Sequence, residues 1–338
     1  MTETDILGSP YTRETIELAD DDEGEVVATL VRRGCDTSVA RGAVLHVHGF
    51  CDYFFQEPQA EFFAALGYDF YALDLRKYGR SLLAHQTPNF CLDLSEYYEE
   101  LDAALALIRQ RDGHAAVIVT GHSTGGLIAP LWAAARHAGG AMVADAFVLN
   151  SPWLDLQGPF YIRTAGTEAI NRLGQRRPYA VVPHTVTGVY AESLHRDLRG
   201  EWDYDWAWKP KQSFPVRAGW LRAIRAGHRS VHRGIDVGAP VMTLSSTRSL
   251  VSQAWSDDAA VADTVLDVKQ IAKWSHQLGP DVTVVRIEGA IHDVFSSRKD
   301  VREVAFGRVE RWLDYAVGPS SSSPRLSSPS PVRRTPRA

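Results

Sequence analysis

Short apolar runs alternate with amphipathic stretches through most of this chain. The runs have the length and composition of buried strands, and the stretches between them carry apolar residues at helical spacing. Strands are predicted at 43–47, 70–73, 116–119, 146–149, 240–244 and 282–287, and helices at 57–66, 93–112, 127–136, 266–276 and 301–317. Such alternation is typical of an α/β fold, with a mostly parallel central sheet and helices on both of its faces.

Other segments fall outside this alternation. Extended runs at 12–18 and 25–32 flank an acidic turn and predict an antiparallel hairpin. Residues 151–236 are rich in aromatic residues and arginines and show no clear strand, which favours a mostly helical insertion. The end of the chain is largely Ser, Pro and Arg, and we expect disorder there because little apolar surface can be buried. The predicted units are a first part of the core (1–150), a helical cap insertion (151–238), a second part of the core (239–317) and a disordered tail (318–338).

Composition and charge narrow the class of protein. The chain has 338 residues, of which 45% are hydrophobic and 23% charged, as in an ordinary globular protein. The formal net charge of -5 and the lack of a basic stripe argue against a nucleic-acid partner. No segment approaches the roughly 18 consecutive apolar residues that a membrane span needs. The N-terminus lacks the features of a secretory signal, and the cysteines have no metal-like spacing, so we expect a cytoplasmic protein without a metal site.

The motif Gly-His-Ser-Thr-Gly at 121–125 is the strongest chemical signal in the chain. It lies between a predicted strand and a predicted helix, which is the context in which a G-x-S-x-G turn presents a reactive serine. Ser123 is therefore the candidate nucleophile. A glycine-rich turn that merely caps a helix is the alternative, but the strand before the motif and the helix after it favour the catalytic interpretation.

A second turn, His48-Gly49-Phe50, follows the strand predicted at 43–47. Attack of a serine on a carbonyl group needs two N–H donors at the developing oxyanion. The backbone N–H groups of Phe50 and Thr124 are the candidates, because one lies just past a strand-end turn and the other follows the serine. An ordinary turn with a structural histidine is the alternative interpretation.

A serine nucleophile also needs a histidine base and an acid that orients the base. His292 follows the last predicted core strand and is the candidate base, whereas its rival His276 lies within a helical pattern. Asp263 precedes a predicted helix and is the favoured acid, with Asp155 and Asp267 as alternatives. Asp267 also fits a helix N-terminus, where the helix dipole alone favours a carboxylate.

Together these motifs resemble the α/β-hydrolase superfamily. The resemblance is strongest to its monoacylglycerol lipase and lysophospholipase group, which includes serine aminopeptidase-like members. The segments that carry it are 48–50, 71–81, 121–126, 263–268 and 288–293. The resemblance implies an α/β-hydrolase fold, a triad of Ser123, Asp263 and His292, a helical cap inserted after the sixth strand, and no cofactor.

The chain departs from the family pattern at two places. Asp74, Arg76, Gly79 and Ser81 match the family segment D-x-R-G-x-G-x-S, but Lys77 stands where the family usually has glycine. The family also commonly reaches its acid within a few residues of the preceding strand. Here the residues 245–262 intervene, which keeps the choice of acid open.

The chemistry implied is hydrolysis of carboxylic esters through a Ser-His-Asp triad and an acyl-enzyme. A small-molecule acyl ester such as a monoacylglycerol or lysophospholipid is the expected substrate, and transient contact with lipid surfaces fits this class. The aromatic residues of the insertion suit a hydrophobic acyl group, although packing is the better explanation for each of them singly. The alternatives are an amide- or peptide-cleaving hydrolase or acyltransferase of the same fold, and a non-catalytic ligand-binding member, because fold alone does not prove activity.

Overall fold

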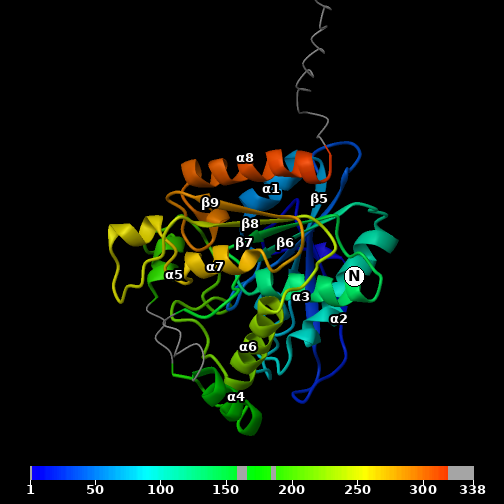
Figure 1. The fold of residues 1–338 in the computed structure, drawn as a ribbon. Helices are drawn as coiled ribbons and strands as arrows, with labels where there is room; N and C mark the ends of the chain where they lie inside the picture. Colours follow the sequence, from blue (N-terminus) through cyan, green and yellow to red (C-terminus); the bar gives the residue numbers. More distant parts are fainter. Residues whose placement is uncertain (1, 158–165, 184–187, 319–338) are drawn as a thin grey trace, which may run out of the picture.

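The computed structural model describes residues 2–157, 166–183 and 188–318, which contain one sheet of nine strands (Figure 1). The strands lie in the order β1-β2-β3-β5-β4-β6-β7-β8-β9. Their bounds are β1 (Glu3–Thr4), β2 (Thr12–Glu17), β3 (Val27–Arg33), β4 (Gly42–Val47), β5 (Tyr68–Asp74), β6 (Val117–His122), β7 (Ala146–Asn150), β8 (Val241–Ser246) and β9 (Val282–Ile287). The pairs from β1 to β5 are antiparallel, and the pairs from β5 to β9 are parallel.

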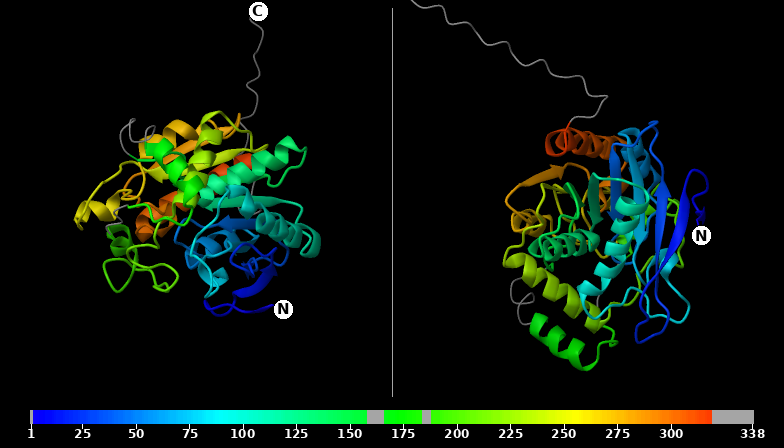
Figure 2. Two further views of the ribbon diagram at one scale, coloured as in Figure 1. Left: turned by 90° about the horizontal axis from the view of Figure 1, so that it is seen from below. Right: turned by 90° about the vertical axis from the view of Figure 1, so that its right-hand side faces the viewer.

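Helices cover both faces of the sheet. α1 (Glu57–Ala65) and α8 (Lys299–Ala316) lie on one face, and α2 (Tyr98–Ala106) and α3 (Gly125–Ala138) lie on the other (Figures 1 and 2). α7 (Val268–Ser275) connects β8 to β9. The predicted α/β class with a mostly parallel sheet is confirmed, and so is the N-terminal hairpin, which is formed by β2 and β3.

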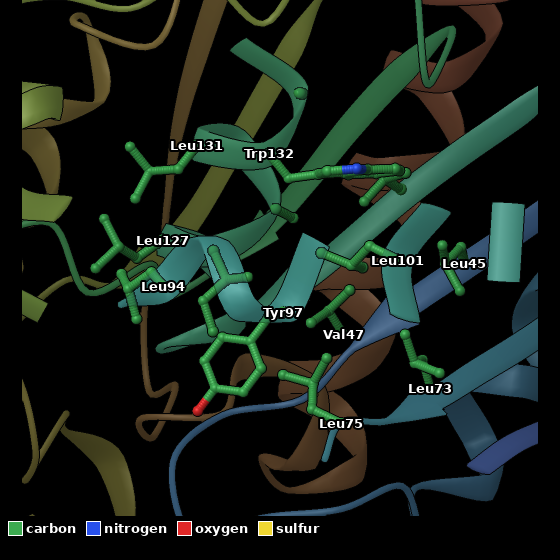
Figure 3. Close-up of a cluster of buried hydrophobic side chains, with 14 of the residues drawn as sticks. Leu45, Val47, Leu73, Leu75, Leu94, Tyr97, Leu101, Leu127, Leu131 and Trp132 are labelled. Atoms are coloured by element: carbon green, nitrogen blue, oxygen red, sulfur yellow. The ribbon is translucent and has the colours of Figure 1, made fainter. Parts of the chain in front are cut away.

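The central strands are apolar on both faces because helices cover both of them. In β4, Val44 packs in the layer that includes α1 and α8, whereas Leu45 and Val47 pack in the layer that includes α2 and α3. Figure 3 shows part of this second layer, where Tyr97 and Trp132 lie among the leucines of helices and strands. The middle of the sheet therefore lies between two packed layers, which make it a rigid support for the loops at the ends of its strands.

The described part of the segment between β7 and β8 contains three helices, and its residues 195–217 form turns and loops. The helices are α4 (Thr167–Arg176), α5 (Val189–Leu194) and α6 (Ala218–His232). The described residues of this segment pair only through isolated bridges, which is consistent with the predicted helical insertion. The segment follows the seventh strand rather than the sixth, because the two-residue β1 was not predicted. The boundaries at 151 and 238 stay a prediction, and the predicted tail lies, apart from Gly318, outside the described residues.

Lys77, which replaces the glycine of the family pattern, has a left-handed backbone with φ of 64°. A side chain costs roughly 1–2 kcal/mol in this conformation, which explains the usual glycine. In this chain the ammonium of Lys77 lies 2.6 Å from the carboxylate of Asp21 and 2.5 Å from that of Glu23. These ion pairs tie the acidic turn of the hairpin to the end of β5.

A buried ion-pair network centred on Arg80 supports the loop that follows β4. The guanidinium donates to Asp5 at 2.7 and 2.8 Å, to Asp74 at 2.9 Å and to the carbonyl of Phe54 at 3.0 Å. The side chain of Arg80 is 1% exposed, and those of both aspartates are 0% exposed. The network therefore joins the N-terminal segment, the end of β5 and the loop after β4 without access to water.

Replacing Arg80 with methionine should lower the free energy of unfolding by about 3–5 kcal/mol, because two carboxylates would stay buried without their cation. Chemical denaturation followed by tryptophan fluorescence measures the change. Arg172→Met is the matched control, since its pair with Glu168 is exposed and its loss should cost below about 1 kcal/mol. Equal losses in the two variants would contradict the structural role of the network.

Candidate active site

Ser123 lies at the sharp turn between β6 and α3, in the strand-turn-helix context predicted for its motif. Its φ is 51°, in the left-handed region that residues with a side chain rarely adopt. The N–H of Ser123 donates to the carbonyl of Asn150 at 3.0 Å, and its carbonyl accepts from the N–H of Trp153 at 2.9 Å. The residues at the end of β7 thus hold this strained backbone in place.

The glycines of the motif are required by the close approach of other backbone segments. A Cβ at Gly121 would lie 2.7 Å from the carbonyl oxygen of Gly125, and a Cβ at Gly125 would lie 2.3 Å from that of Val47. A Cβ at Gly126 would lie 2.7 Å from the Cβ of Pro152. A side chain at Gly125 would push the turn away from the end of β4, one at Gly126 would push it away from the residues after β7, and one at Gly121 would collide with the turn itself.

The candidate oxyanion donors lie on two turns that meet beside the serine. A Cβ at Gly49 would lie 3.1 Å from the Cβ of Ser123, which shows how closely the turns approach. Within the described part of the chain, the N–H groups of Phe50 and Thr124 donate no hydrogen bond. Both donors are therefore available to a ligand atom at this position.

His48 supports the first of these turns. Its Nδ1 lies 2.8 Å from the carbonyl oxygen of Gly49, and its Nε2 accepts from the N–H of Leu75 at 3.0 Å. Burial lowers the pKa of His48, which keeps the imidazole neutral. This histidine therefore has a structural part in the turn, as the alternative interpretation proposed, while the turn itself still presents the N–H of Phe50.

His292 lies in the loop after β9, and its Nδ1 is 3.0 Å from Oδ2 of Asp263. The two side chains are 3% and 0% exposed. The other carboxylate oxygen accepts from the N–H groups of Val265 at 2.8 Å and Leu266 at 2.7 Å. Three hydrogen bonds thus fix the carboxylate against the imidazole.

Asp263 reaches this position because the long loop after β8 folds back on itself. The N–H of Asp263 donates to the carbonyl of Arg248 at 3.0 Å, and its carbonyl accepts from the N–H of Leu250 at 2.8 Å. Ser249 forms an isolated parallel bridge with Asp263. The intervening residues therefore loop out, and the acid lies beside a short extension of β8, close to where the family resemblance places it.

Two rival candidates belong to α7. Asp267 caps the start of this helix by accepting from the N–H of Lys269 at 3.0 Å, which is the helix-terminus role considered for it. His276 lies at the end of the same helix and is exposed. The contacts recorded for these two residues are those of helix ends.

Asp155, the remaining candidate acid, lies near the start of the segment between β7 and β8 and pairs with a residue of the same segment. Its Oδ1 accepts from Nη1 of Arg225 in α6 at 2.9 Å and from the N–H of Leu156 at 2.8 Å. Among the three candidate acids, Asp263 is the one placed within hydrogen-bond distance of His292 in the described residues.

Sequence reasoning missed a buried cluster around Asp293. Its carboxylate accepts from Nδ2 of Asn150 at 2.6 Å and from Oγ of Ser296 at 2.5 Å. Burial acts to raise the pKa of Asp293, but the nearby ring of His122 and these hydrogen bonds outweigh it and lower the pKa overall. The charged carboxylate therefore anchors the loop after β9 to the end of β7.

A second buried cluster was also missed. The carboxylate of Asp52 joins Nδ1 of His122 at 3.1 Å to Nζ of Lys209 at 2.8 Å. Burial acts to raise the pKa of Asp52, but the ammonium of Lys209 and the hydrogen bond with His122 outweigh it, so the pKa lies far below its usual value. The cluster combines a residue of the insertion with residues of the two turns around Ser123.

Aromatic residues pack the insertion onto the loops of the candidate site. The cluster consists of Tyr53, Phe55, Leu194, Trp202, Tyr204 and Ile291, with Tyr190, Trp206 and Trp208 at its margin. Nε1 of Trp202 donates to the carbonyl of Ser296 at 2.8 Å, and the ring of Tyr190 lies 5.3 Å from that of His292. These tryptophans and tyrosines hold the segment between β7 and β8 against the core.

The sheet order, the crossover helices and the serine turn define an α/β hydrolase. The sequence model of one family, described as "Serine aminopeptidase, S33", matches residues 38–299, which is more than half of the chain. The chain therefore belongs to this family. A search of the curated proteins finds no match.

Solved structures share the fold at low sequence identity. A soluble variant of monoglyceride lipase from Saccharomyces cerevisiae has a TM-score of 0.64 and 17% identity, over 90% of this chain and 95% of that one. The monoacylglycerol lipase of Paleococcus ferrophilus has a TM-score of 0.60 and 17% identity, over 85% and 98%. A thermostable carboxyl esterase from Bacillus coagulans has a TM-score of 0.60 and 16% identity, over 90% and 99%. These likenesses establish the fold.

Other features of the described residues bear on the kind of site. They contain no group of three or more His, Cys, Asp or Glu side chains arranged to hold a metal ion. No helix in the described ranges has the length and apolar character needed to cross a membrane. Cys35, Cys51 and Cys91 are free thiols.

Proposed function

We propose that this protein is a serine hydrolase that cleaves carboxylic esters through Ser123, His292 and Asp263. Its proposed substrates are monoacylglycerols, lysophospholipids or similar acyl esters. The observation that carries the proposal is the 3.0 Å contact between His292 and Asp263, with the ring of His292 5.0 Å from that of His122, the residue before the strained Ser123. The similar structures, which include two lipases of monoacylglycerols and a carboxyl esterase, support this substrate class. The proposed reaction uses no cofactor.

In this reaction Asp263 sets the tautomer of His292. The carboxylate accepts from Nδ1–H, which leaves the lone pair of Nε2 free to take the proton of the Ser123 hydroxyl. The serine oxygen then attacks the carbonyl carbon of the ester. Asp263 stays charged and stabilises the imidazolium that forms.

The tetrahedral intermediate carries a negative oxygen, to which the N–H groups of Phe50 and Thr124 donate. His292 then gives its proton to the leaving alkoxide, the alcohol departs, and the acyl group stays on the oxygen of Ser123. A water molecule that loses its proton to His292 attacks this acyl-enzyme. His292 returns this proton to the oxygen of Ser123 as the acyl bond breaks, which releases the carboxylic acid and restores the serine hydroxyl.

Cleavage of an amide bond is the second candidate, because the family description names an aminopeptidase. An aminopeptidase has to bind the ammonium group of its substrate, and a carboxylate whose oxygens are not already hydrogen-bonded within the protein suits that purpose. The buried carboxylates beside the site already have partners: Asp52 is paired with Lys209, and Asp293 accepts from Asn150. This arrangement favours esters, and rates on matched p-nitrophenyl esters and p-nitroanilides separate the two candidates.

Ser123→Ala should lower kcat for p-nitrophenyl esters by a factor of about 10⁴ or more, because the nucleophile is lost. Ester chains of several lengths should be compared, and a fluorophosphonate probe should label the wild type but not the variant. Ser275→Ala is the control, since it removes a buried hydroxyl that bonds only within α7, to the carbonyl of Ile271. Full hydrolysis by Ser123→Ala would contradict the mechanism, and a folded wild type that resists the probe would favour the non-catalytic alternative.

Asp263→Asn should lower kcat by a factor of about 10⁴, because an amide in place of the carboxylate favours the wrong tautomer of His292. Asp267→Asn makes the same chemical change on the neighbouring helix cap, where asparagine caps about as well, and should leave kcat unchanged. Steady-state kinetics on one ester measures both. Normal activity of the first variant and loss in the second would move the acid role to Asp267.

The proposed base also predicts a pH dependence. Only the neutral imidazole of His292 can accept the serine proton, so kcat/KM should fall about tenfold per pH unit on the acid side of its midpoint. Ester hydrolysis at substrate concentrations well below KM measures this limb. A profile that stays flat from acid to neutral pH would be incompatible with His292 as the base.

A further inference from the structure

Lys209 belongs to the segment between α5 and α6, and its ammonium group is buried. Nζ donates to Oδ1 of Asp52 at 2.8 Å. It also lies 5.7, 5.6 and 5.7 Å from the ring centroids of Phe55, Tyr190 and Tyr204, where the faces of aromatic rings attract a cation. Burying a charged lysine is costly unless it is paired, so its place here is set by the carboxylate of Asp52.

The carboxylate of Asp52 extends this contact to the serine turn. Oδ2 lies 3.1 Å from Nδ1 of His122, and the charged carboxylate accepts the proton of that nitrogen. Nε2 of the same ring is buried and has no hydrogen-bond partner among the described residues. The hydrogen bonds therefore run in one chain from Lys209 of the insertion to the residue before Ser123.

Asp52 and His122, the two residues of this hydrogen-bonded series that belong to the core, each adjoin a part of the proposed catalytic machinery. Asp52 follows the oxyanion turn that presents Phe50, and His122 directly precedes Ser123. The ring centroid of His122 lies 5.0 Å from that of His292. A change at Lys209 or at His122 therefore acts on the nucleophile, the oxyanion donors and the base together.

We propose that Lys209 is a positioning residue for this hydrolysis, supplied by the insertion. Through Asp52 and His122 it holds the oxyanion turn beside Ser123, and its positive charge balances the carboxylate of Asp52, which contacts the His122 ring between Asp52 and His292. The inference rests on the proposed function and deepens it, since it assigns to the insertion a part in the reaction. In this role Lys209 acts through Asp52 and touches no reacting atom.

The charge balance matters because the titratable groups here lie close together. In the described residues, the titratable groups that face the ring of His292 are Asp263 from the loop after β8, His122 from the end of β6 and Tyr190 from α5. The ring of His122 in turn interacts with Asp52 from the loop after β4, His46 from β4 and Asp293 from the loop after β9. Burial lowers the pKa of His46 to about 3, so this ring stays neutral at working pH. Asp52 and Lys209 together are neutral, so removing either one changes by one unit the net charge beside His122, whose ring lies 5.0 Å from that of His292.

The acid limb of kcat/KM on a p-nitrophenyl ester tests this role in three variants. Lys209→Met leaves the carboxylate of Asp52 unbalanced, which favours protonation of His292 and should move the limb to higher pH by about 0.5 unit or more. Asp52→Asn leaves the cation unbalanced and should move the limb to lower pH by a similar amount. The double variant is neutral again, so its limb should return to within about 0.2 unit of the wild type. Its kcat should stay about 10-fold lower, because the charged carboxylate that orients His122 is gone.

Lys211→Met is the matched control, since it removes a partly exposed lysine of the same segment, paired with Glu192, and should change neither kcat nor the limb. Fluorophosphonate labelling of Ser123 in each variant reports an assembled site. Shifts in the same direction, or no shifts in active variants, would overturn the inference while leaving the proposed function intact. A wild type that neither labels nor hydrolyses esters would overturn the proposed function instead.

A single variant that buries one unpaired charge can fail to fold. The double variant then decides, because it removes both charges of the pair and leaves neither one unpaired: a lower kcat with a wild-type limb supports the positioning role, and a wild-type kcat overturns it. Lys209→Arg retains the cation and should keep the acid limb of the wild type. A displaced limb in this variant would also count against charge balance as the cause.

Discussion

The left-handed backbone of Ser123 is the constraint on which the rest of the site depends. A residue with a side chain keeps this conformation only where its surroundings over-determine it. Hydrogen bonds to Asn150 and Trp153 hold the serine from one side, and the carbonyl of Val47 confines Gly125 from the other. The two apolar layers keep the ends of β4, β6 and β7 in place, so the turn cannot relax without moving packed strands.

Three buried carboxylates share the work of joining the loops around this turn. Each binds a residue far away in the sequence: Asp263 binds His292, Asp293 binds Asn150, and Asp52 binds Lys209. A buried carboxylate is stable only while its partners stay, so each of these contacts resists displacement of a loop. Polar contacts thus make the loops at the carboxyl ends of the strands rigid, as apolar packing does for the middle of the sheet.

Local patterns made much of this molecule predictable. Hydrophobic periodicity indicated every strand except β1, which is too short to form a pattern, and motif spacing indicated the turn of Ser123 and the loop of His292. Asp263 kept rivals because only the folded loop shows that residues 248–250 bring it back to β8. The pair of Lys209 and Asp52 spans 157 residues and has no local signature, so one sequence gives no sign of it. The left-handed backbone of Lys77 was likewise hidden, since its ion pairs exist only after the hairpin has formed.

The order of strands places one part of the site after a central strand and another after a marginal strand. The turn of Ser123 follows β6, which has neighbours on both sides, whereas the loop of His292 follows β9, the strand at the margin. Most residues of β9 are only partly shielded from water. Marginal strands open at lower free energy than central ones, through fluctuations that leave the remaining structure folded. Reversible fraying of β9 would therefore separate the imidazole from an undisturbed serine, so that catalytic competence and global stability have different temperature limits.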